Sequence, residues 1–317
     1  MTRHSVPWKW ILPLLILVAI VVISWLHGRR PALPSIAVVL PSAVNPYWLE
    51  VKAGAEDATS QLRGRYDVRI EASQSMDAAS QTALLNGFLS RGDVNALVLG
   101  PASDTDTVPT VSKYSAAGIP IIVIDTELNP VAAKANNVKV TAFIGSDNVD
   151  GGFKAGEIML KALTSRGGTP RVLMLEGLPV HQSAIDRANG FMKAVGNHFQ
   201  VVRENGEWSR DKAQEIVASK FSREKFAGIF GSNDEMALGA IAALKALHVS
   251  KAQWPVIVGF DATPDGLAAI KNGEMFATIK QDGRELGRQG VLDAVKALRH
   301  DPSLQTYQLL PLTAIDR

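Results

Sequence analysis

The chain has 317 residues, of which 46% are hydrophobic and 20% are charged, and it contains no cysteine. This length suits two domains better than one, and the apolar fraction is too high for a disordered chain. The lack of cysteine excludes disulfide scaffolds, thiolate metal sites and a cysteine nucleophile. The first 35 residues carry four basic residues and no acid, so the rest holds 29 basic and 31 acidic residues. Such a balance is not typical of a nucleic-acid-binding protein.

An uncharged apolar run occupies residues 11–26, preceded by Arg3 and Lys9 and flanked by Trp8, Trp10 and Trp25. It has no amphipathic period, so a buried core helix is disfavoured. The run is long for a secretory signal and lacks a good cleavage site, yet it is slightly short for a bilayer span. We therefore interpret residues 1–34 as a signal peptide or signal anchor plus a linker, with both alternatives open.

After the linker, short apolar runs alternate with helical patterns. The pattern predicts strands at 36–40, 68–72, 96–99, 121–124, 142–144, 171–175, 201–203, 228–230, 256–258 and 276–279. It predicts helices at 48–62, 78–90, 107–117, 152–165, 184–195, 211–220, 235–247, 265–272 and 284–299. Apolar strands that are each followed by a helix indicate parallel sheets covered on both faces. Ten strands would make one sheet very wide, so we expect an α/β chain with two sheets in two lobes.

Polar and aromatic side chains gather directly after these strands. In parallel α/β sheets, ligands bind beyond the carboxyl ends of the strands. The residues found there are Asn, Asp, Arg, Gln and aromatics, which suit the hydroxyls and the C–H faces of a sugar ring. They lie in the stretches 41–48, 125–126, 177–187, 205–208, 232–234, 260–261 and 280–281.

Each of these residues also has an ordinary structural interpretation. Asp125 and Asp261 could cap helices, and either Asn233 or Asp234 could cap the helix at 235–247. Asn45 could be a turn residue, Tyr47 and Trp48 core, Arg187 a solvated charge, and Trp208 the anchor of a surface loop. Their occurrence together at the same ends of two sheets favours a binding site.

Four segments carry a resemblance to a known family. They read NPYW at 45–48, IGSDN at 144–148, SNDEMALGA at 232–240 and VGFDATPDG at 258–266. From about residue 35 to the C-terminus the chain resembles the ribose-binding-protein group of periplasmic sugar-binding proteins. The resemblance implies two Rossmann-like lobes joined by a three-strand hinge. Lobe one would comprise 35–146 and 282–310, and lobe two 147–281 and 311–317.

The resemblance also implies which residues contact a sugar held between the lobes. Tyr47 and Trp208 would sandwich the ring with Trp48 beside them, while Asp125 and Asp261 accept hydrogen bonds from hydroxyls. The full implied set is Asn45, Tyr47, Trp48, Asp125, Arg187, Trp208, Asn233, Asp261 and Gln281. The ribose binders have Arg where this chain has Thr126, and Phe at the three aromatic positions. Another pentose, a hexose, a deoxysugar or a polyol therefore stays open.

The function implied is a periplasmic solute-binding protein that delivers a monosaccharide or polyol to the permease of an ABC importer. We expect a monomer with no cofactor, no metal and no catalytic residue. An alternative is a membrane-tethered sensory subunit that signals to a sensor kinase or chemoreceptor. A DNA-binding repressor is disfavoured because no helix-turn-helix segment precedes the body. An enzyme is disfavoured because nucleotide, hydrolase-elbow and zinc-protease motifs are absent, and His181 is expected to be a local hydrogen-bonding residue.

Overall fold

The computed structural model describes residues 15, 17–18, 33–62, 64–164 and 169–316. The chain divides into two units, Met1–Pro34 and Ser35–Arg317. The predicted signal or anchor at 11–26 lies outside the described residues except for Leu15, Leu17 and Val18, so it stays a prediction. Across the part of the chain that is described, no helix combines the length and apolar character needed to cross a membrane.

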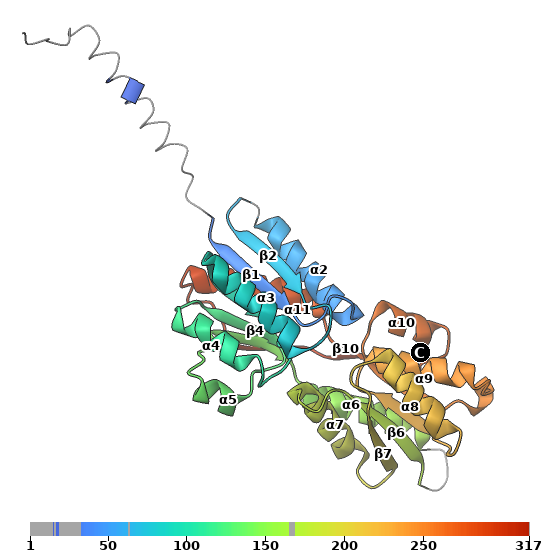
Figure 1. Ribbon diagram of the computed structural model, residues 1–317. Coiled ribbons are helices and arrows are strands. Elements are labelled where there is room, and N and C mark those ends of the chain that lie inside the picture. The colour runs from blue at the N-terminus through green and yellow to red at the C-terminus, as the bar shows by residue number, and fades with distance from the viewer. Residues whose placement is uncertain (1–14, 16, 19–32, 63, 165–168, 317) are drawn as a thin grey trace, which may run out of the picture. The chain divides into compact units, whose positions relative to one another are not determined.

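Residues from both ends of Ser35–Arg317 build a first six-stranded sheet in the order β11-β5-β4-β3-β1-β2 (Figure 1). All of its neighbouring strands pair in parallel. The sheet's helices pack on its two faces, α2 with α11 on one and α3 with α4 on the other. The strands are β1 (Ser35–Leu40), β2 (Asp67–Ala72), β3 (Val94–Leu99), β4 (Ile121–Asp125), β5 (Ala142–Ser146) and β11 (Tyr307–Leu310); the helices are α2 (Pro46–Gln61), α3 (Ala78–Arg91), α4 (Val108–Ala116), α5 (Pro130–Ala135) and α11 (Gly283–Leu298).

The second sheet repeats this plan in the order β12-β10-β9-β8-β6-β7, with only β12 antiparallel to its neighbour among the described strands. Its strands are β6 (Arg171–Glu176), β7 (Gln200–Asn205), β8 (Gly228–Gly231), β9 (Val256–Asp261), β10 (Ala277–Lys280) and β12 (Thr313–Asp316). Its helices are α6 (Asn148–Leu163), α7 (Gln182–Val195), α8 (Arg210–Phe221), α9 (Asp234–Ala246), η1 (Lys251–Gln253) and α10 (Pro264–Lys271). The predicted class, two parallel α/β lobes, is confirmed.

The alternation of side chains along the central strands explains why helices cover both faces of each sheet. In β1, Ile36 and Val38 enter one apolar core while Ala37 and Val39 enter the other. Successive side chains of a strand point to opposite faces, so a strand that is apolar throughout must be buried on both sides. This arrangement leaves the carboxyl ends of the strands as the place where polar side chains can gather.

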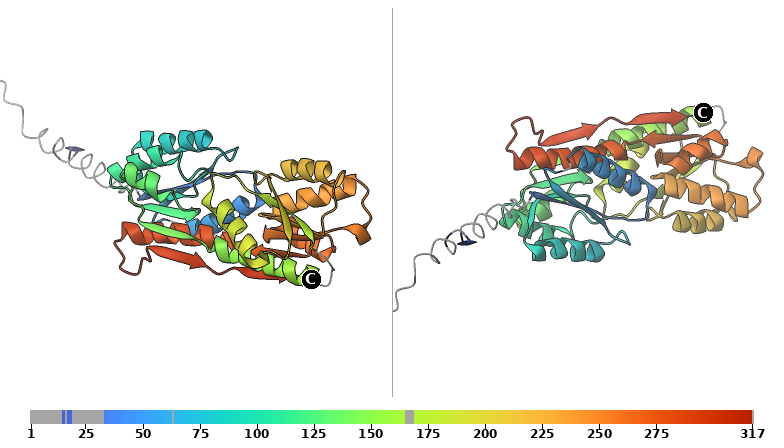
Figure 2. Two further views of the ribbon diagram at one scale, coloured as in Figure 1. Left: turned by 90° about the horizontal axis from the view of Figure 1, so that it is seen from below. Right: turned by 90° about the horizontal axis from the view of Figure 1, so that it is seen from above.

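The chain passes between the two sheets three times. It crosses after β5, again between β10 and α11, and finally between β11 and β12. Figure 2 shows the last crossing as the red C-terminal segment that belongs to both sheets. These three connections match the number expected for a three-strand hinge, while the lobe boundaries at 146/147, 281/282 and 310/311 stay a prediction.

Candidate functional site

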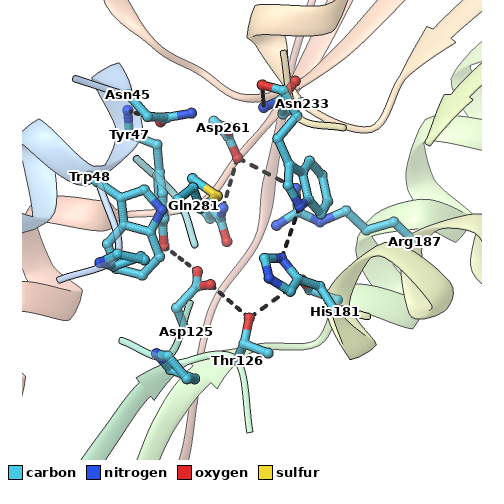
Figure 3. Close-up of a pocket in the computed structure, with 15 residues that line it drawn as sticks. Asn45, Tyr47, Trp48, Asp125, Thr126, His181, Arg187, Asn233, Asp261 and Gln281 are labelled. Atoms are coloured by element: carbon cyan, nitrogen blue, oxygen red, sulfur yellow. Dashed lines mark hydrogen bonds and ion pairs between the residues drawn. The ribbon is translucent and has the colours of Figure 1, made fainter. Parts of the chain in front are cut away.

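One pocket between the carboxyl ends of the two sheets is lined by every one of the nine side chains named from the sequence (Figure 3). The space open to the centre of a water molecule is about 40 Å³. Since roughly 10–15 Å³ of such space holds one water, the pocket is narrow and suits a small molecule. The nine residues are joined in the lining by Pro41, Met76, Pro101, Thr126, His181 and Ser183.

The side of the pocket built on the first sheet is organised around Asp125, the last residue of β4. Its Oδ1 accepts a hydrogen bond from the Tyr47 hydroxyl at 2.8 Å, and its Oδ2 accepts one from the Thr126 hydroxyl at 2.9 Å. Burial and the nearby Asp125 charge raise the pKa of Tyr47 well above its usual value, so the phenol stays protonated. Two neutral hydroxyls therefore hold this carboxylate in place.

Asn45 precedes α2 and caps it, because its Oδ1 accepts a hydrogen bond from the Tyr47 backbone N–H at 3.0 Å. Asn45 is therefore a helix cap, in place of the turn residue that the sequence allowed, and it also lines the pocket. The cap also fixes the start of the helix that carries Tyr47 and Trp48. These two rings meet edge to face with centroids 5.3 Å apart.

Two glycines leave room for the indoles that face the pocket. A Cβ on Gly100, directly after β3, would lie 2.7 Å from the Trp48 ring. A Cβ on Gly177, directly after β6, would lie 2.0 Å from the Trp208 ring. Each sheet therefore seats one indole against bare backbone, where any larger side chain would displace the ring.

The side built on the second sheet is organised around Arg187 of α7, which is 4% exposed. Its Nε donates to Asn148 Oδ1 at 2.8 Å and its Nη1 donates to the Ser232 carbonyl at 2.7 Å. Nη1 also lies 3.6 Å from Asp261 Oδ1. The solvated-charge interpretation of Arg187 is therefore wrong: the guanidinium is buried and held by three separate segments.

Asp261 ends β9 and forms the acidic partner of this network. Gln281 Nε2 donates to its Oδ1 at 2.7 Å. Burial raises the pKa of Asp261 well above its usual value, and the opposing effect of Arg187 only partly offsets it. Neither Asp125 nor Asp261 caps a helix, since Asn129 caps α5 and Thr263 caps α10.

The neighbouring pair Asn233 and Asp234 divides two structural tasks. Asn233 is the N-cap of α9, with its Oδ1 accepting from Met236 N–H at 2.9 Å, and its Nδ2 donates to the Trp208 carbonyl at 3.3 Å. Asp234 is fully buried and accepts from the Thr263 N–H at 2.7 Å and from the Thr278 hydroxyl at 2.7 Å. Asp234 thus fixes the loop that follows Asp261.

Backbone strain concentrates at the strand ends that face the pocket. Asp125, Trp208 and Asp261 have φ angles of 70°, 58° and 108°. L-residues seldom adopt such angles, and they persist where the surrounding structure determines them, often at functional sites. Three of the nine predicted positions therefore carry the kind of strain that is common at functional sites.

Five polar side-chain atoms of the pocket lining have no hydrogen-bond partner among the described residues. Three are donors, Nη2 of Arg187, Nδ2 of Asn45 and Nε1 of Trp48, and two are acceptors, Oδ2 of Asp261 and Oε1 of Gln281. The guanidinium carbon of Arg187 lies 5.4 Å from the centroid of the Trp208 ring. The pocket therefore offers both free donors and free acceptors together with aromatic rings.

The six lining residues that the sequence reasoning did not select follow the same rule as the nine. Thr126, His181 and Ser183 come after β4 and β6, and Pro101 and Met76 come after β3 and β2. Pro41, Thr126, His181 and Ser183 lie in the strand-end stretches named from the sequence but were not selected as contacts, whereas Met76 and Pro101 lie outside those stretches.

Comparison with known proteins agrees with this geometry. A model of the periplasmic binding protein domain matches residues 36–302. The chain is 33% identical to the ribose import binding protein of Haemophilus influenzae over 84% of this chain and 86% of that one. It is 29% identical to the D-apiose import binding protein of Paraburkholderia graminis, over 86% and 83% of the two chains.

A solved ABC transporter solute-binding protein from Burkholderia multivorans superposes with a TM-score of 0.82, at 27% identity over 90% of this chain and 99% of that one. Its unidentified ligand is represented as α-D-erythrofuranose. The curated relatives are binding proteins for import, which confirms that a non-enzymatic role was correctly expected. The chain therefore belongs to the periplasmic binding protein family, in the ribose-binding-protein group that its motifs resemble.

Proposed function

We propose that this chain is an extracytoplasmic solute-binding protein that traps one monosaccharide or polyol and delivers it to an ABC importer. One observation carries the proposal: the pocket that contains the indoles of Trp48 and Trp208 also holds three free donors and two free acceptors. A sugar hydroxyl both donates and accepts, and its C–H faces pack on aromatic rings. The names of the relatives, which refer to import of ribose and apiose, support the same class.

The nine residues predicted from the sequence are proposed as the ligand contacts. Arg187 Nη2 and Asn45 Nδ2 would donate to hydroxyl oxygens, while Asp261 Oδ2 and Gln281 Oε1 would accept from hydroxyl protons. The rings of Tyr47, Trp48 and Trp208 would cover the ligand's apolar faces. Because the pocket joins two sheets connected by three crossings, we propose that ligand enters an open form and that the sheets close on it.

The pocket's selectivity is proposed to differ from that of the ribose binders at Thr126. The Thr126 hydroxyl donates its only hydrogen to Asp125 and lies 3.4 Å from the Ser183 hydroxyl, so it has no hydrogen left to donate to a ligand. An arginine in this place would instead present several donors to the ligand. We therefore expect a ligand with fewer acceptors on this side than ribose offers, such as a deoxysugar or a branched or shortened pentose.

Calorimetric titration of the purified chain against ribose, apiose, other pentoses, hexoses, deoxysugars and linear and cyclic polyols tests the proposal. We expect at least one member to bind with a change in tryptophan emission, because Trp48 and Trp208 line the pocket. A disaccharide serves as the control, since the narrow pocket should exclude it. Failure of every monosaccharide and polyol to bind would overturn the proposed function.

A further inference from the structure

His181 has two structural partners in different parts of the molecule. Its Nδ1 accepts a hydrogen bond from Trp208 Nε1 at 2.9 Å, and its Nε2 lies 2.8 Å from the carbonyl oxygen of Ala102. The rings of His181 and Trp208 stack with an interplanar angle of 26°. Because Nδ1 accepts, the ring is neutral with its proton on Nε2, which donates to Ala102. His181 is 6% exposed; its bond to Ala102 is buried and its bond with Trp208 is partly buried.

These partners belong to different sheets. His181 and Trp208 follow β6 and β7 of the second sheet, whereas Ala102 follows β3 of the first. Two residues further along, Ser183 meets Thr126 of the first sheet at 3.4 Å. The start of α7 therefore carries contacts to the first sheet, and Arg187 lies one turn later on the same helix (Figure 3).

His181 occupies a helix position that normally has another use. It is the N-cap of α7, but its side chain makes no capping hydrogen bond. In α6, α8 and α9 the N-cap side chain does accept a backbone N–H. A capping Ser, Asp or Asn would stabilise α7 locally, so the use of His here favours a role for the side chain away from the helix.

We propose that His181 is a positioning residue that orients Trp208 toward the ligand and latches the second sheet to the first through Ala102. The inference rests on the proposed function, since it assigns two tasks within that binding site. Neither ring nitrogen is free, so His181 does not itself bind the ligand by hydrogen bonds. It stabilises the closed arrangement and thereby raises apparent affinity, because affinity scales with the populated fraction of the binding-competent form.

Two substitutions separate the tasks. In His181→Asn the side-chain oxygen replaces Nδ1 and keeps the Trp208 bond, but nothing reaches Ala102. In His181→Gln the amide replaces Nε2 and reaches Ala102, but the Trp208 bond is lost. A net contribution of one hydrogen bond corresponds to about a three- to tenfold change in an equilibrium constant.

The measurements are ligand dissociation rate by stopped flow and the emission of Trp208, obtained as the difference between spectra with and without Trp208→Phe. We expect His181→Asn to release the best panel ligand about three- to tenfold faster with little change in Trp208 emission. We expect His181→Gln to shift the Trp208 emission to the red, with a smaller effect on release. His248→Asn, at an exposed position, is the matched control and should match the wild type.

Unchanged release in His181→Asn would overturn the latch, and unchanged Trp208 emission in His181→Gln would overturn the positioning role. If no panel ligand binds the wild type, the proposed function fails. The Trp208 emission of ligand-free His181→Gln then still tests whether His181 positions Trp208. Small-angle scattering of ligand-free His181→Asn tests whether the bond to Ala102 holds the two sheets together. A more extended particle than the wild type supports the latch, and an unchanged one contradicts it.

Discussion

The two sheets contribute opposite kinds of chemistry to the pocket. On the first sheet the only charged group in the pocket lining is Asp125, half-buried and held by the hydroxyls of Tyr47 and Thr126. On the second sheet Arg187 and Asp261 are 4% and 8% exposed and lie in one network with Asn148 and Gln281. The first side is aromatic and hydroxyl-based, and the second is ionic.

This difference teaches that the two sides should respond differently to substitution. Removing one partner from a buried ion pair leaves an uncompensated charge, which destabilises the whole protein. Removing a hydroxyl from a carboxylate that is half in solvent costs little, because water replaces it. We therefore expect changes on the second side to affect both stability and binding, and changes on the first side to affect mainly binding.

The largest effect is expected for Arg187→Met, which strands the Asp261 carboxylate in the interior. Thermal or denaturant unfolding should show a loss of about 3–5 kcal/mol, and calorimetry should detect no ligand binding. Arg203→Met, which removes an exposed partner of Glu176, should cost less than about 1 kcal/mol.

The double variant Arg187→Met with Asp261→Asn sharpens this prediction. Because the stranded charge is gone, stability should return most of the way to the wild type while binding stays absent. A double variant as unstable as the single one would mean that Arg187 acts through packing against Phe260, whose ring centroid lies 3.7 Å from the guanidinium carbon.

The next effect concerns the pH dependence of stability through Asp234. Burial raises the pKa of this carboxyl to about 6, despite hydrogen bonds from Thr278 and Thr263. A raised pKa in the folded state contributes stability that is fully present below the unfolded pKa of about 3.9 and is lost as pH rises through about 6. The wild type should therefore lose about 2 kcal/mol of unfolding free energy between pH 4 and pH 7 relative to Asp234→Asn.

Denaturant unfolding across pH 3.5 to 8 measures this difference. The exposed substitution Asp211→Asn is the control and should follow the wild-type profile. If Asp234→Asn shows the same slope as the wild type, the buried carboxyl does not titrate in this window, and the ionic character of the second side is smaller than the geometry indicates.

A smaller effect is expected for Tyr47→Phe on the first side. The change removes the donor to Asp125 Oδ1 but keeps the ring, so affinity should fall by about tenfold, corresponding to a hydrogen bond to a charged group. Stability should change little. Tyr114→Phe removes a buried hydroxyl bond to the Leu85 carbonyl outside the pocket, so it should reduce stability and leave affinity unchanged.

The smallest effect is expected for Thr126→Val, which removes the second donor to Asp125 and the contact with Ser183. We expect about a threefold loss of affinity, seen mainly as faster dissociation. A loss as large as that of Arg187→Met would contradict the division between a hydroxyl-based and an ionic side.

Much of the fold could be predicted because its signals are local. All ten predicted strands and nine predicted helices occur, with ends shifted by a few residues. The short helix α5 and the edge strands β11 and β12 were not predicted. β11 alternates between exposed and half-buried residues and β12 is mostly exposed, so neither carries a continuous buried apolar run, and β12 gains its place from pairing with β10.

Most of the residues that line the pocket could also be predicted, but the hydrogen bonds among them could not. Strand ends of a parallel sheet converge, so nine residues far apart in sequence meet in one place. Which of them bond to each other depends on side-chain geometry: Tyr47 reaches Asp125 across 78 positions, and Trp208 reaches His181 across 27. The sequence identified His181 as a local hydrogen-bonding residue but not as a bridge between the sheets.

The position of α11 and β11 near the end of the sequence has a consequence for biosynthesis. The first sheet starts at residue 35, yet its core contains Leu286, Val291 and Ala294, and its edge strand β11 ends at Leu310. A ribosome must therefore synthesise the chain as far as about residue 310 before the first sheet can complete its core. We expect folding to occur late, as one event after elongation, and not domain by domain during synthesis.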